Sequence, residues 1–462
     1  MAGVLWAFIA IFIGCLLVYR FGNWALLQPR WAVGLLVFGT GTPLGIGLTS
    51  CLFFLQRLAF PGLPAISIAI ELALLAWAGY EVFRRRLPLS AGAPRPTFPL
   101  NLFVAAALLL ALAVVTIAMT GAWDGNPHGN WDAWSIWNLR AEFLRTGGEL
   151  ASRAWSPLLA AHPEYPLLVS AFVARCWAYG HSASTAVPIA TSYLFLLALV
   201  ALTTGGVAVL RSQSLGLLLG LGLLGTPTVL HEVPSQYADI PLACYLAGSL
   251  VLMFLDRPVL AGISASMAAW TKDEGLMFLA VFFAATMVYK RHHAVRLVAG
   301  AVPVGLLLLV FKTVLARGAP SLLASSGHAL LTKIGDLSRY GKIIAAFGGE
   351  FSAMASGWYH PILPVIALAV LLRFDRAYRR DLLFCGGVCI SLLLGDFAVY
   401  VITPYDLVWH LQTSLGRLFV QLWPCLLLAV FVGLRAPESM AVGSPQAVAP
   451  KPAKIRHKAK TA

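Results

Sequence analysis

Charged side chains are scarce in this 462-residue sequence, and acidic ones are scarcer than basic ones. Asp, Glu, Lys and Arg together make up 11% of the chain, whereas 59% of its residues are hydrophobic and its mean hydropathy is +0.81. Soluble globular domains carry about 25% charged residues. The shortage of charge therefore excludes an ordinary soluble protein and predicts a polytopic membrane protein.

The sequence also lacks any paired arrangement of cysteine. Its seven cysteines are an odd number, lie mainly in apolar runs and form no Cys-x-x-Cys pair. Neither a disulfide framework nor a cysteine-based zinc site is therefore indicated. A basic region is missing before the first apolar run, so we interpret that run as a membrane span and not as a signal peptide.

The net charge of +14 does not predict a nucleic-acid partner. Nucleic-acid-binding proteins gather their basic residues on one face or in one domain. Here the basic residues sit at the ends of apolar runs, which is the pattern that membrane topology produces.

Thirteen apolar runs are candidate membrane spans, because about 20 apolar residues suffice to cross a bilayer. Clusters of Lys and Arg predict which ends of the runs face the cytoplasm. Inside and outside loops alternate along the chain only if the N-terminus is outside and residues 165–180 do not cross the membrane. We interpret that short segment, which contains Arg175, as a helix lying in the membrane interface. The runs cover residues 1–19, 31–54, 63–83, 100–121, 187–210, 213–230, 240–255, 258–271, 275–289, 297–315, 361–372, 382–402 and 418–434.

This topology divides an all-α protein of the inner (plasma) membrane into three parts. Residues 1–99 form an N-terminal block of three spans, residues 100–435 the main transmembrane module, and residues 436–462 a disordered basic tail in the cytoplasm. The first large outer loop, 122–186, is expected to contain interfacial amphipathic helices. The outer segments, which face the periplasm or exterior, are 122–186, 231–239, 272–274, 316–360 and 403–417.

The first outer loop gathers acids, bases, His and Trp between two long apolar blocks. Asn130 or Asp132 opens a predicted helix of about three turns, which places the Asp132 carboxylate just under the bilayer surface. The alternative is that Asp132 is only an N-cap, but the density of Trp favours an interfacial, substrate-facing helix. Along it Ile136, Trp137, Leu139 and Phe143 could face lipid, while Arg140 and Arg145 stay in water. The residues of this loop and of the connector 231–239 that we expect on the acceptor or substrate side are Asp124, Trp134, Trp137, Arg140, Gln236 and Tyr237.

A second polar string, His-Pro-Glu-Tyr-Pro, lies in the same loop at residues 162–166, where the interfacial helix begins. His162, Glu164 and Tyr165 could contact an acceptor, and the first two could bind a metal. A rigid structural turn explains the string equally well, because each Pro restricts the residue before it.

The connector 231–239 is unusually polar for a simple hairpin between two spans. It contains Gln236 and Tyr237 and ends at Asp239, and polar groups at a membrane boundary often mark function. Asp239 alone would also serve as a cap on the following helix.

Three cationic or titratable residues lie on the same outer side. Lys272 interrupts apolar sequence in the string WTKDEG, where a local salt bridge is the alternative explanation. His410 and Arg417 enter the last predicted span. Together the three would make a cationic seat for a phosphate at the membrane surface.

These strings resemble the membrane-embedded glycosyltransferases of the C superfamily. The similar branch contains protein O-mannosyltransferases, the lipid A aminoarabinose transferase and the lipopolysaccharide-core transferases of rhizobia. The resemblance covers about residues 120–435 and is carried by WDAWSIWNLRAEFL, HPEYPLL, QYADIPLA, AAWTKDEG and YDLVWHLQTSLGRL.

The resemblance implies a role for several residues. Asp132 would be the catalytic base, Asp239 the second acid, and Lys272 a basic residue near a lipid phosphate. Asp124 precedes Asp132 in the same loop and could take its role, so the choice between the two stays open. The family's pattern implies transfer with inversion at the anomeric carbon.

The residues suit the chemistry that the resemblance implies. A polyprenyl-phosphate leaving group needs no general acid, so the site needs a base for the acceptor hydroxyl and cations for the phosphate. The expected partners are a lipid-linked sugar donor and a glycan, lipid or protein acceptor. No cofactor is certain, and a divalent metal is possible although no known ligand spacing is present.

Two other classes remain alternatives. A polytopic transporter would suit many spans, but the charges gather at one surface, and duplicated halves with broken helices are not evident. An O-antigen ligase or polymerase would also carry cations in an outer loop, and we expect it to depend on Arg and His more than on Asp132.

Overall fold

The computed structural model describes residues 2–24, 26–84, 99–159, 161–318, 327–354 and 359–441. Within these ranges the secondary structure is helical, apart from one isolated bridge between Phe374 and Leu434. Eight helical segments are long and apolar enough to cross a bilayer, so this is a multi-pass membrane protein. They are α1 (Ala2–Phe21), α2 (Arg30–Ala59), α3 (Pro64–Arg84), α4 (Pro99–Gly125), α7 (Ala186–Leu210), α18 (Leu407–Gly433), and α13 (Ala294–Val310) and α17 (Arg379–Ile402) with their flanking turns.

The thirteen predicted spans are not confirmed, because several apolar runs form shorter helices. The run 213–230 is broken after Gly225, and Pro227 begins a separate helix. Lys272 adopts an extended conformation (φ −160°) that separates two more helices. The shorter helices are α5 (Asn138–Thr146), α6 (Leu168–Tyr179), α8 (Gln213–Leu224), α9 (Pro227–Glu232), α10 (Asp239–Phe254), α11 (Pro258–Thr271), α12 (Asp273–Tyr289), α14 (Gly327–Gly335), α15 (Leu337–Ala353), α16 (Ile362–Leu372) and α19 (Pro437–Ala441). Short π and 3-10 turns are η1 (Ala133–Trp137), η2 (Gly148–Trp155), η3 (Arg291–His293), η4 (Phe311–Leu315) and η5 (Arg376–Tyr378). The predicted disordered tail, 436–462, begins with the short helix α19 and is therefore not disordered at its start. From residue 442 onward it lies outside the described residues.

Helix α2 packs closely against α1 and α7. A Cβ atom on Gly14 or Gly45 would overlap backbone atoms of the facing helix, so α1 and α2 approach at glycine. Gly39 of α2 and Gly205 of α7 make a similar approach between those helices. Small residues allow such close contacts between membrane helices, where hydrophobic burial gives little drive for association.

Helix α6 is not the interfacial helix that the sequence predicts. Eleven of its twelve residues are buried, and α1, α2, α3 and α11 lie against it. Arg175, which we took as a sign of exposure to water, donates to both carboxylate oxygens of Glu71 on α3, and both side chains are fully buried. The ion pair supplies the partner that a charge needs inside the protein.

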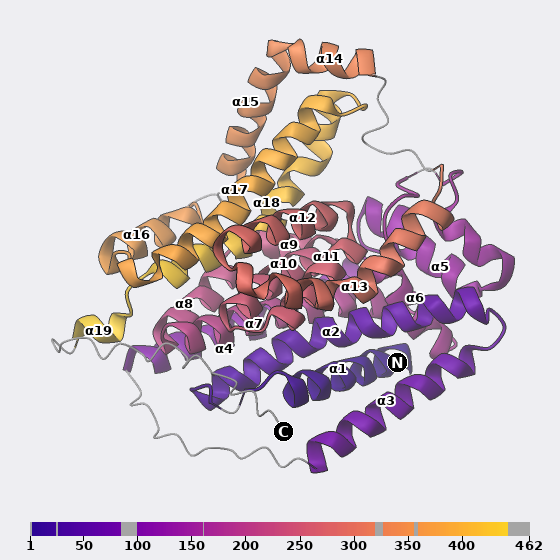
Figure 1. Cartoon of the computed structure of the whole chain (residues 1–462), viewed down its shortest axis with the longest axis horizontal. Helices are drawn as coiled ribbons and strands as arrows, with labels where there is room; N and C mark the ends of the chain where they lie inside the picture. The colour runs from indigo at the N-terminus through magenta and orange to yellow at the C-terminus, as the bar shows by residue number, and fades with distance from the viewer. Residues whose placement is uncertain are drawn as a thin grey trace, which may run out of the picture.

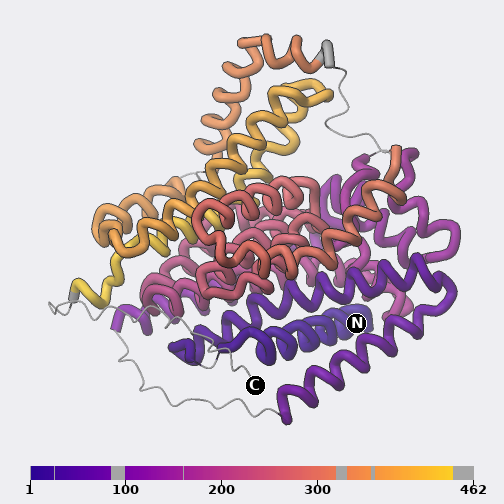
Figure 2. Tube along the Cα trace, in the orientation of Figure 1, coloured from indigo at the N-terminus to yellow at the C-terminus, as the bar shows by residue number. Residues whose placement is uncertain are grey.

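The centre of the bundle is α10, of which 15 of 16 residues are buried. It packs against α7, α11 and α18 (Figure 1). Helices α14 and α15 and the adjoining ends of α17 and α18 project from this body (Figures 1 and 2). Asp239 begins α10, so the central helix places a carboxylate at one end of the core.

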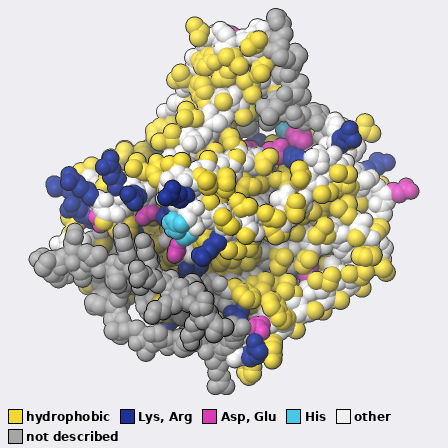
Figure 3. Space-filling model, viewed as in Figure 1, with side chains coloured by type: hydrophobic (Ala, Val, Ile, Leu, Met, Phe, Trp, Pro, Cys, Tyr) yellow, Lys and Arg dark blue, Asp and Glu magenta, His cyan; other side chains and the backbone are white. Residues whose placement is uncertain are grey.

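Hydrophobic side chains cover most of the face in Figure 3, as expected for a surface in contact with lipid. Lys and Arg gather at the end of the molecule where α16 and α19 lie. The connector between α16 and α17 carries the exposed Arg373 and Arg376, and the first turn of α17 carries the exposed Arg379 and Arg380.

Candidate functional site

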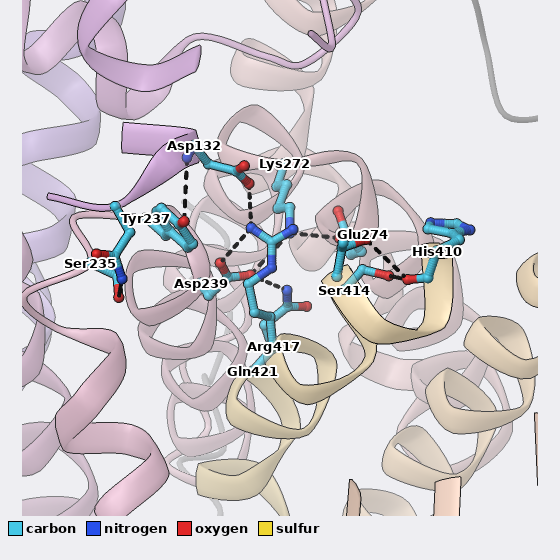
Figure 4. Close-up of polar contacts among 12 residues, drawn as sticks. Asp132, Ser235, Tyr237, Asp239, Lys272, Glu274, His410, Ser414, Arg417 and Gln421 are labelled. Atoms are coloured by element: carbon cyan, nitrogen blue, oxygen red, sulfur yellow. Dashed lines mark hydrogen bonds and ion pairs between the residues drawn. The ribbon is translucent and has the colours of Figure 1, made fainter. Parts of the chain in front are cut away.

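The buried carboxylate of Asp239 is the centre of a polar cluster (Figure 4). One of its oxygens accepts from Lys272 Nζ at 3.0 Å and from the side-chain amide of Gln421. The other oxygen lies 3.9 Å from Arg417 Nη1. The side chain of Asp239 is only 1% exposed, so two cations and an amide offset the cost of burying its charge.

Arg417 and Gln421 reach Asp239 from the same face of α18, because they are one helical turn apart. Arg417 also forms an ion pair with Asp132 through Nη1, and its guanidinium lies over the ring of Tyr237, 5.1 Å from the centroid. One cation therefore connects the first outer loop with the start of the central helix.

Asp132 is held by contacts between its loop and the connector 231–239. Its backbone N–H donates to the Tyr237 hydroxyl at 3.3 Å. The Asn130 side chain donates to Ser235 Oγ at 2.9 Å, and its backbone N–H donates to the Ser235 carbonyl at 3.2 Å. These bonds fix the position of Asp132 immediately before the π turn η1.

Gln236 has a structural role between the same two segments. It adopts a left-handed conformation (φ +59°). Its amide accepts from Asn138 at 3.2 Å and donates to the Pro127 carbonyl at 3.1 Å. We placed Gln236 on the substrate side, but its side chain is 2% exposed and both its amide atoms are occupied.

Lys272 is buried at the break between α11 and α12. Its ammonium lies 3.0 Å from Asp239 and 2.8 Å from Glu274, so it bridges two carboxylates. The sequence string WTKDEG allows a local salt bridge, and the contact between Lys272 and Glu274 forms one. The same lysine is therefore part of a local salt bridge and of the cluster around Asp239.

Several buried polar atoms of this cluster have no hydrogen-bond partner among the described residues. These atoms are Glu232 Oε1, Asp239 Oδ2, Glu274 Oε2 and Arg417 Nε. More than about 90% of buried polar groups in folded proteins are hydrogen-bonded. A concentration of unpaired donors and acceptors around two cations is the property of a site that binds a polar ligand.

A cavity of about 270 Å³ adjoins the cluster. It lies between α9, α15 and α18, and Arg417 belongs to both the cavity wall and the cluster. The volume is close to the lower end of the range for small-molecule sites, about 300–1,000 Å³. Its polar lining consists of Thr228, His231, Glu232, Glu350, Gln412, Thr413 and Arg417, and its apolar lining of Met354, Gly416, Phe419 and Val420.

Arg140 and Trp137 do not have the environments that we predicted. Arg140 was expected in water, but it is fully buried and donates to the carbonyls of Ala154, Pro163 and Tyr165. Burial lowers the pKa of Arg140 to about 10, so the side chain stays charged at neutral pH. Arg140 therefore organises the loop by satisfying backbone carbonyls, which composition alone does not reveal.

Trp137 was expected toward lipid, but it is 1% exposed and stacks on Tyr165 with ring centroids 5.8 Å apart.

Other predicted acceptor-side residues surround the cluster without joining it. Trp134 is 48% exposed and packs edge-on against Trp131. His162 Nδ1 lies 3.0 Å from Glu164, and its ring stacks on Tyr165. Asp124 is exposed at the end of α4 and has no ion pair within the described part of the chain.

His410 does not contribute to the expected cationic seat. It lies two turns before Arg417 on α18, and its Nδ1 is 2.9 Å from the Thr403 hydroxyl. Figure 4 shows its ring pointing away from Arg417. Lys272 and Arg417 are therefore the cations that the structure brings together from our predicted set.

A possible metal-ligand group lies elsewhere. Among the described residues, Asp256, His292 and His293 have ligand atoms within 4.8 Å of one another. Asp256 follows the C-terminal end of α10, and His292 and His293 precede α13. Asp239 lies at the opposite, N-terminal end of α10. With a rise of about 1.5 Å per residue, this 16-residue helix separates the group from the site by about 24 Å.

Three residues near the cluster were not among our predicted site residues. Gln421 was recognisable only by its spacing of four from Arg417. Glu232 stood in the polar connector, but its sequence position does not reveal that it lines a cavity. Asp396 is 5% exposed within α17, and an acid inside a predicted span is itself a signal of function.

Comparison with models of known protein families, with curated proteins and with solved structures found no match to this chain.

Proposed function

We propose that this protein is an inverting glycosyltransferase that moves a sugar from a polyprenyl-phosphate donor to an acceptor hydroxyl on the outer face of the inner (plasma) membrane. The observation that supports this function best is the cluster of Asp132, Asp239, Lys272 and Arg417. These residues come from four separate segments and meet beside a cavity of monosaccharide scale, about 270 Å³.

The donor phosphate is expected to bind Arg417 and Lys272. Arg417 is 20% exposed on its side chain and presents a planar fork of donors, which suits phosphate oxygens. Both cations already contact carboxylates, so the phosphate competes with Asp132 for Arg417. Donor binding would then release the Asp132 side chain from its ion pair.

Asp239 would keep the two cations in place. It contacts both of them from a fully buried position, and the Gln421 amide donates to the same oxygen as Lys272. Its charge offsets part of the repulsion between Lys272 and Arg417, which allows two cations to face one phosphate. This is a positioning role and does not require Asp239 to exchange a proton.

The transfer itself would be a displacement at the anomeric carbon. The acceptor oxygen attacks the carbon while the bond to the phosphate oxygen breaks, and the polyprenyl phosphate leaves as an anion. The cations stabilise that developing charge, so no acid is needed on the leaving side. A carboxylate takes the acceptor proton, and Asp132 is the candidate implied by the resemblance.

The exposed tryptophans give the acceptor a place to dock. Trp131 and Trp134 are 63% and 48% exposed and stand at the entrance of the loop that carries Asp132. Aromatic rings combine an apolar body with a polar edge and suit both sugar rings and lipid interfaces.

The test is transfer by the purified full-length protein in vesicles. Radiolabelled polyprenyl-phosphate hexoses and pentoses serve as donor probes, and an envelope lipid extract serves as acceptor. We expect label to move to the extract, and Arg417→Ala and Lys272→Ala to reduce the rate at least 100-fold. Arg153→Ala, which removes an exposed cation from the loop that carries Asp132, is the matched control.

A deletion strain distinguishes this function from the two alternatives. We expect a lipid-linked monosaccharide to accumulate and one envelope glycan to lose a residue. Accumulation of a lipid-linked oligosaccharide would instead indicate a ligase or polymerase. Flux of solute across sealed vesicles without covalent transfer would indicate a transporter, and either result would overturn the proposal.

A further inference from the structure

The cavity between α9, α15 and α18 contains a carboxyl group that the proposed transfer has not yet used. Glu232 ends α9 and lines the cavity together with Arg417. Its Oε1 atom is buried and has no hydrogen-bond partner among the described residues. A buried, unpaired carboxyl oxygen costs free energy, so it needs a reason to be retained.

Three carboxylates around Arg417 differ in how they are engaged. Asp132 forms a direct ion pair with Arg417. Asp239 accepts from Lys272 and Gln421 and lies behind the cations, with 1% of its side chain exposed. Glu232 makes no ion pair with a described residue, and it lies on the wall of an open cavity. A base must have a lone pair directed at its proton. Of these three carboxylates, Glu232 is the one that lines the cavity and has no ion pair with a described residue.

We infer that this cavity receives the nucleophilic group of the acceptor, and that Glu232, and not Asp132, accepts its proton. The inference rests on the proposed glycosyl transfer and refines it. Asp132 then becomes a positioning residue that holds Arg417 until the donor phosphate arrives.

The step balances without a further reagent. The acceptor hydroxyl oxygen forms a bond to the anomeric carbon, and the carbon–oxygen bond to the phosphate breaks. The electron pair leaves with the polyprenyl phosphate, and the hydroxyl proton goes to the Glu232 carboxylate. The neutral carboxylic acid then loses its proton to water through the cavity.

The cavity lining suits an acceptor with several hydroxyl groups. Thr228, Thr413 and Gln412 supply donors and acceptors, and Phe419 supplies an apolar surface. Glu350 on α15 adds a second carboxylate to the wall. Such a lining can form hydrogen bonds with the hydroxyl groups of a sugar ring. A second phosphate group would be repelled by the carboxylates of Glu232 and Glu350. The inferred acceptor is therefore the hydroxyl of a glycan or glycolipid headgroup.

The electrostatic environment supports a proton-accepting role. Burial, followed by the nearby Asp239 carboxylate, raises the pKa of Glu232 to about 8. The ideal pKa of a catalytic base lies near the working pH. The titratable and charged groups that face Glu232 are Asp132, His231, Asp239, Lys272, Glu350 and Arg417.

The experiment compares pH–rate profiles of transfer from the same radiolabelled polyprenyl-phosphate hexoses and pentoses to the same lipid extract. The unsubstituted protein should gain rate about tenfold per pH unit below 8 and level off above it. Glu232→Gln should lower kcat by at least about 100-fold and remove this rise. Asp132→Asn should lower the KM for donor, because the phosphate no longer competes with a carboxylate for Arg417, and it should keep the rise.

Two controls separate chemistry from folding. Glu232→Asp keeps a carboxyl group and should retain the pH-dependent rise at a reduced rate. Glu149→Gln makes the same chemical change at an exposed position and should leave the profile unchanged.

The failure of this inference is distinct from that of the proposed function. If the unsubstituted protein transfers none of the probe sugars at any pH, both fail. If it transfers sugar and Glu232→Gln keeps the same rate and profile, only the assignment of Glu232 is overturned. Loss of the rise in Asp132→Asn instead would return the role of base to Asp132.

Discussion

Two buried carboxylates allow stability and function to be separated by matched substitutions. Asp239→Asn and Glu71→Gln each remove one negative charge from a buried ion pair without changing shape. Asp239 lies 3.0 Å from Lys272 Nζ, and Glu71 lies 2.7 Å from Arg175 Nε. At an effective dielectric constant of about 20, each attraction is worth about 5–6 kcal/mol before desolvation is counted.

The two cations that remain differ in their other partners. Lys272 keeps Glu274 at 2.8 Å, so Asp239→Asn leaves it paired. Arg175 has no second carboxylate within the described part of the chain, and its other contacts are to Trp6, Cys176 and aromatic rings. Breaking a buried pair completely costs about 3–5 kcal/mol. We therefore expect Glu71→Gln to lower the free energy of unfolding by about 3–5 kcal/mol, and Asp239→Asn to lower it by about 1–3 kcal/mol.

Thermal unfolding in detergent, followed by a thiol-reactive dye, measures this difference. Six of the seven cysteines are buried and all seven are free, so dye labelling reports loss of the fold. Glu71→Gln should unfold at the lower temperature and keep most transferase activity below its transition. Asp239→Asn should lose activity at least 100-fold while it remains folded. A lower unfolding temperature for Asp239→Asn than for Glu71→Gln would refute the reasoning.

Three further predictions concern packing and the site. Arg417→Lys should lower transfer about 10- to 100-fold in kcat/KM, because lysine lacks the planar fork that donates to two phosphate oxygens together; an unchanged value would contradict a bidentate role. Gly45→Ala should lower the unfolding temperature, because its Cβ would meet the Ala10 carbonyl, whereas Gly34→Ala, which meets no atom within 4 Å, should not. Arg140→Met should destabilise the outer loop by about 2–4 kcal/mol, because three buried carbonyl acceptors lose their donor; limited proteolysis between residues 146 and 164 should accelerate, and equal cleavage rates would argue against this role.

The helical membrane character was predictable from composition, but the number of spans was not. Hydropathy measures how apolar a segment is and does not tell whether lipid or protein surrounds it. Helices α10 and α11 are apolar because protein covers them, and both are shorter than a bilayer crossing. Arg175 in α6 indicated exposure to water because its partner, Glu71, lies 104 positions away in sequence.

The proximity of four candidate site residues could be predicted because charges at span ends share one membrane surface. The sequence could not show that Arg140 would satisfy backbone carbonyls, or that Gln236 would join two loops. Those roles depend on where unpaired backbone groups lie in the folded chain. The roles that we propose for Asp132, Asp239, Lys272 and Arg417 remain predictions.

The shortness of α10 has a consequence for the lipid environment. At about 24 Å, the helix falls short of a hydrocarbon layer of about 30 Å. Asp239 at one end and the Asp256–His293 pair beyond the other are polar, and both ends require contact with water or with charged partners. Where the far end of α10 lies at the opposite membrane surface, the Asp239 end would be recessed below the headgroups, and the proposed lipid phosphate would descend several ångströms to reach it. Vesicles made from short-chain lipids should lessen that descent and speed the capture of donor, whereas thick bilayers should slow it.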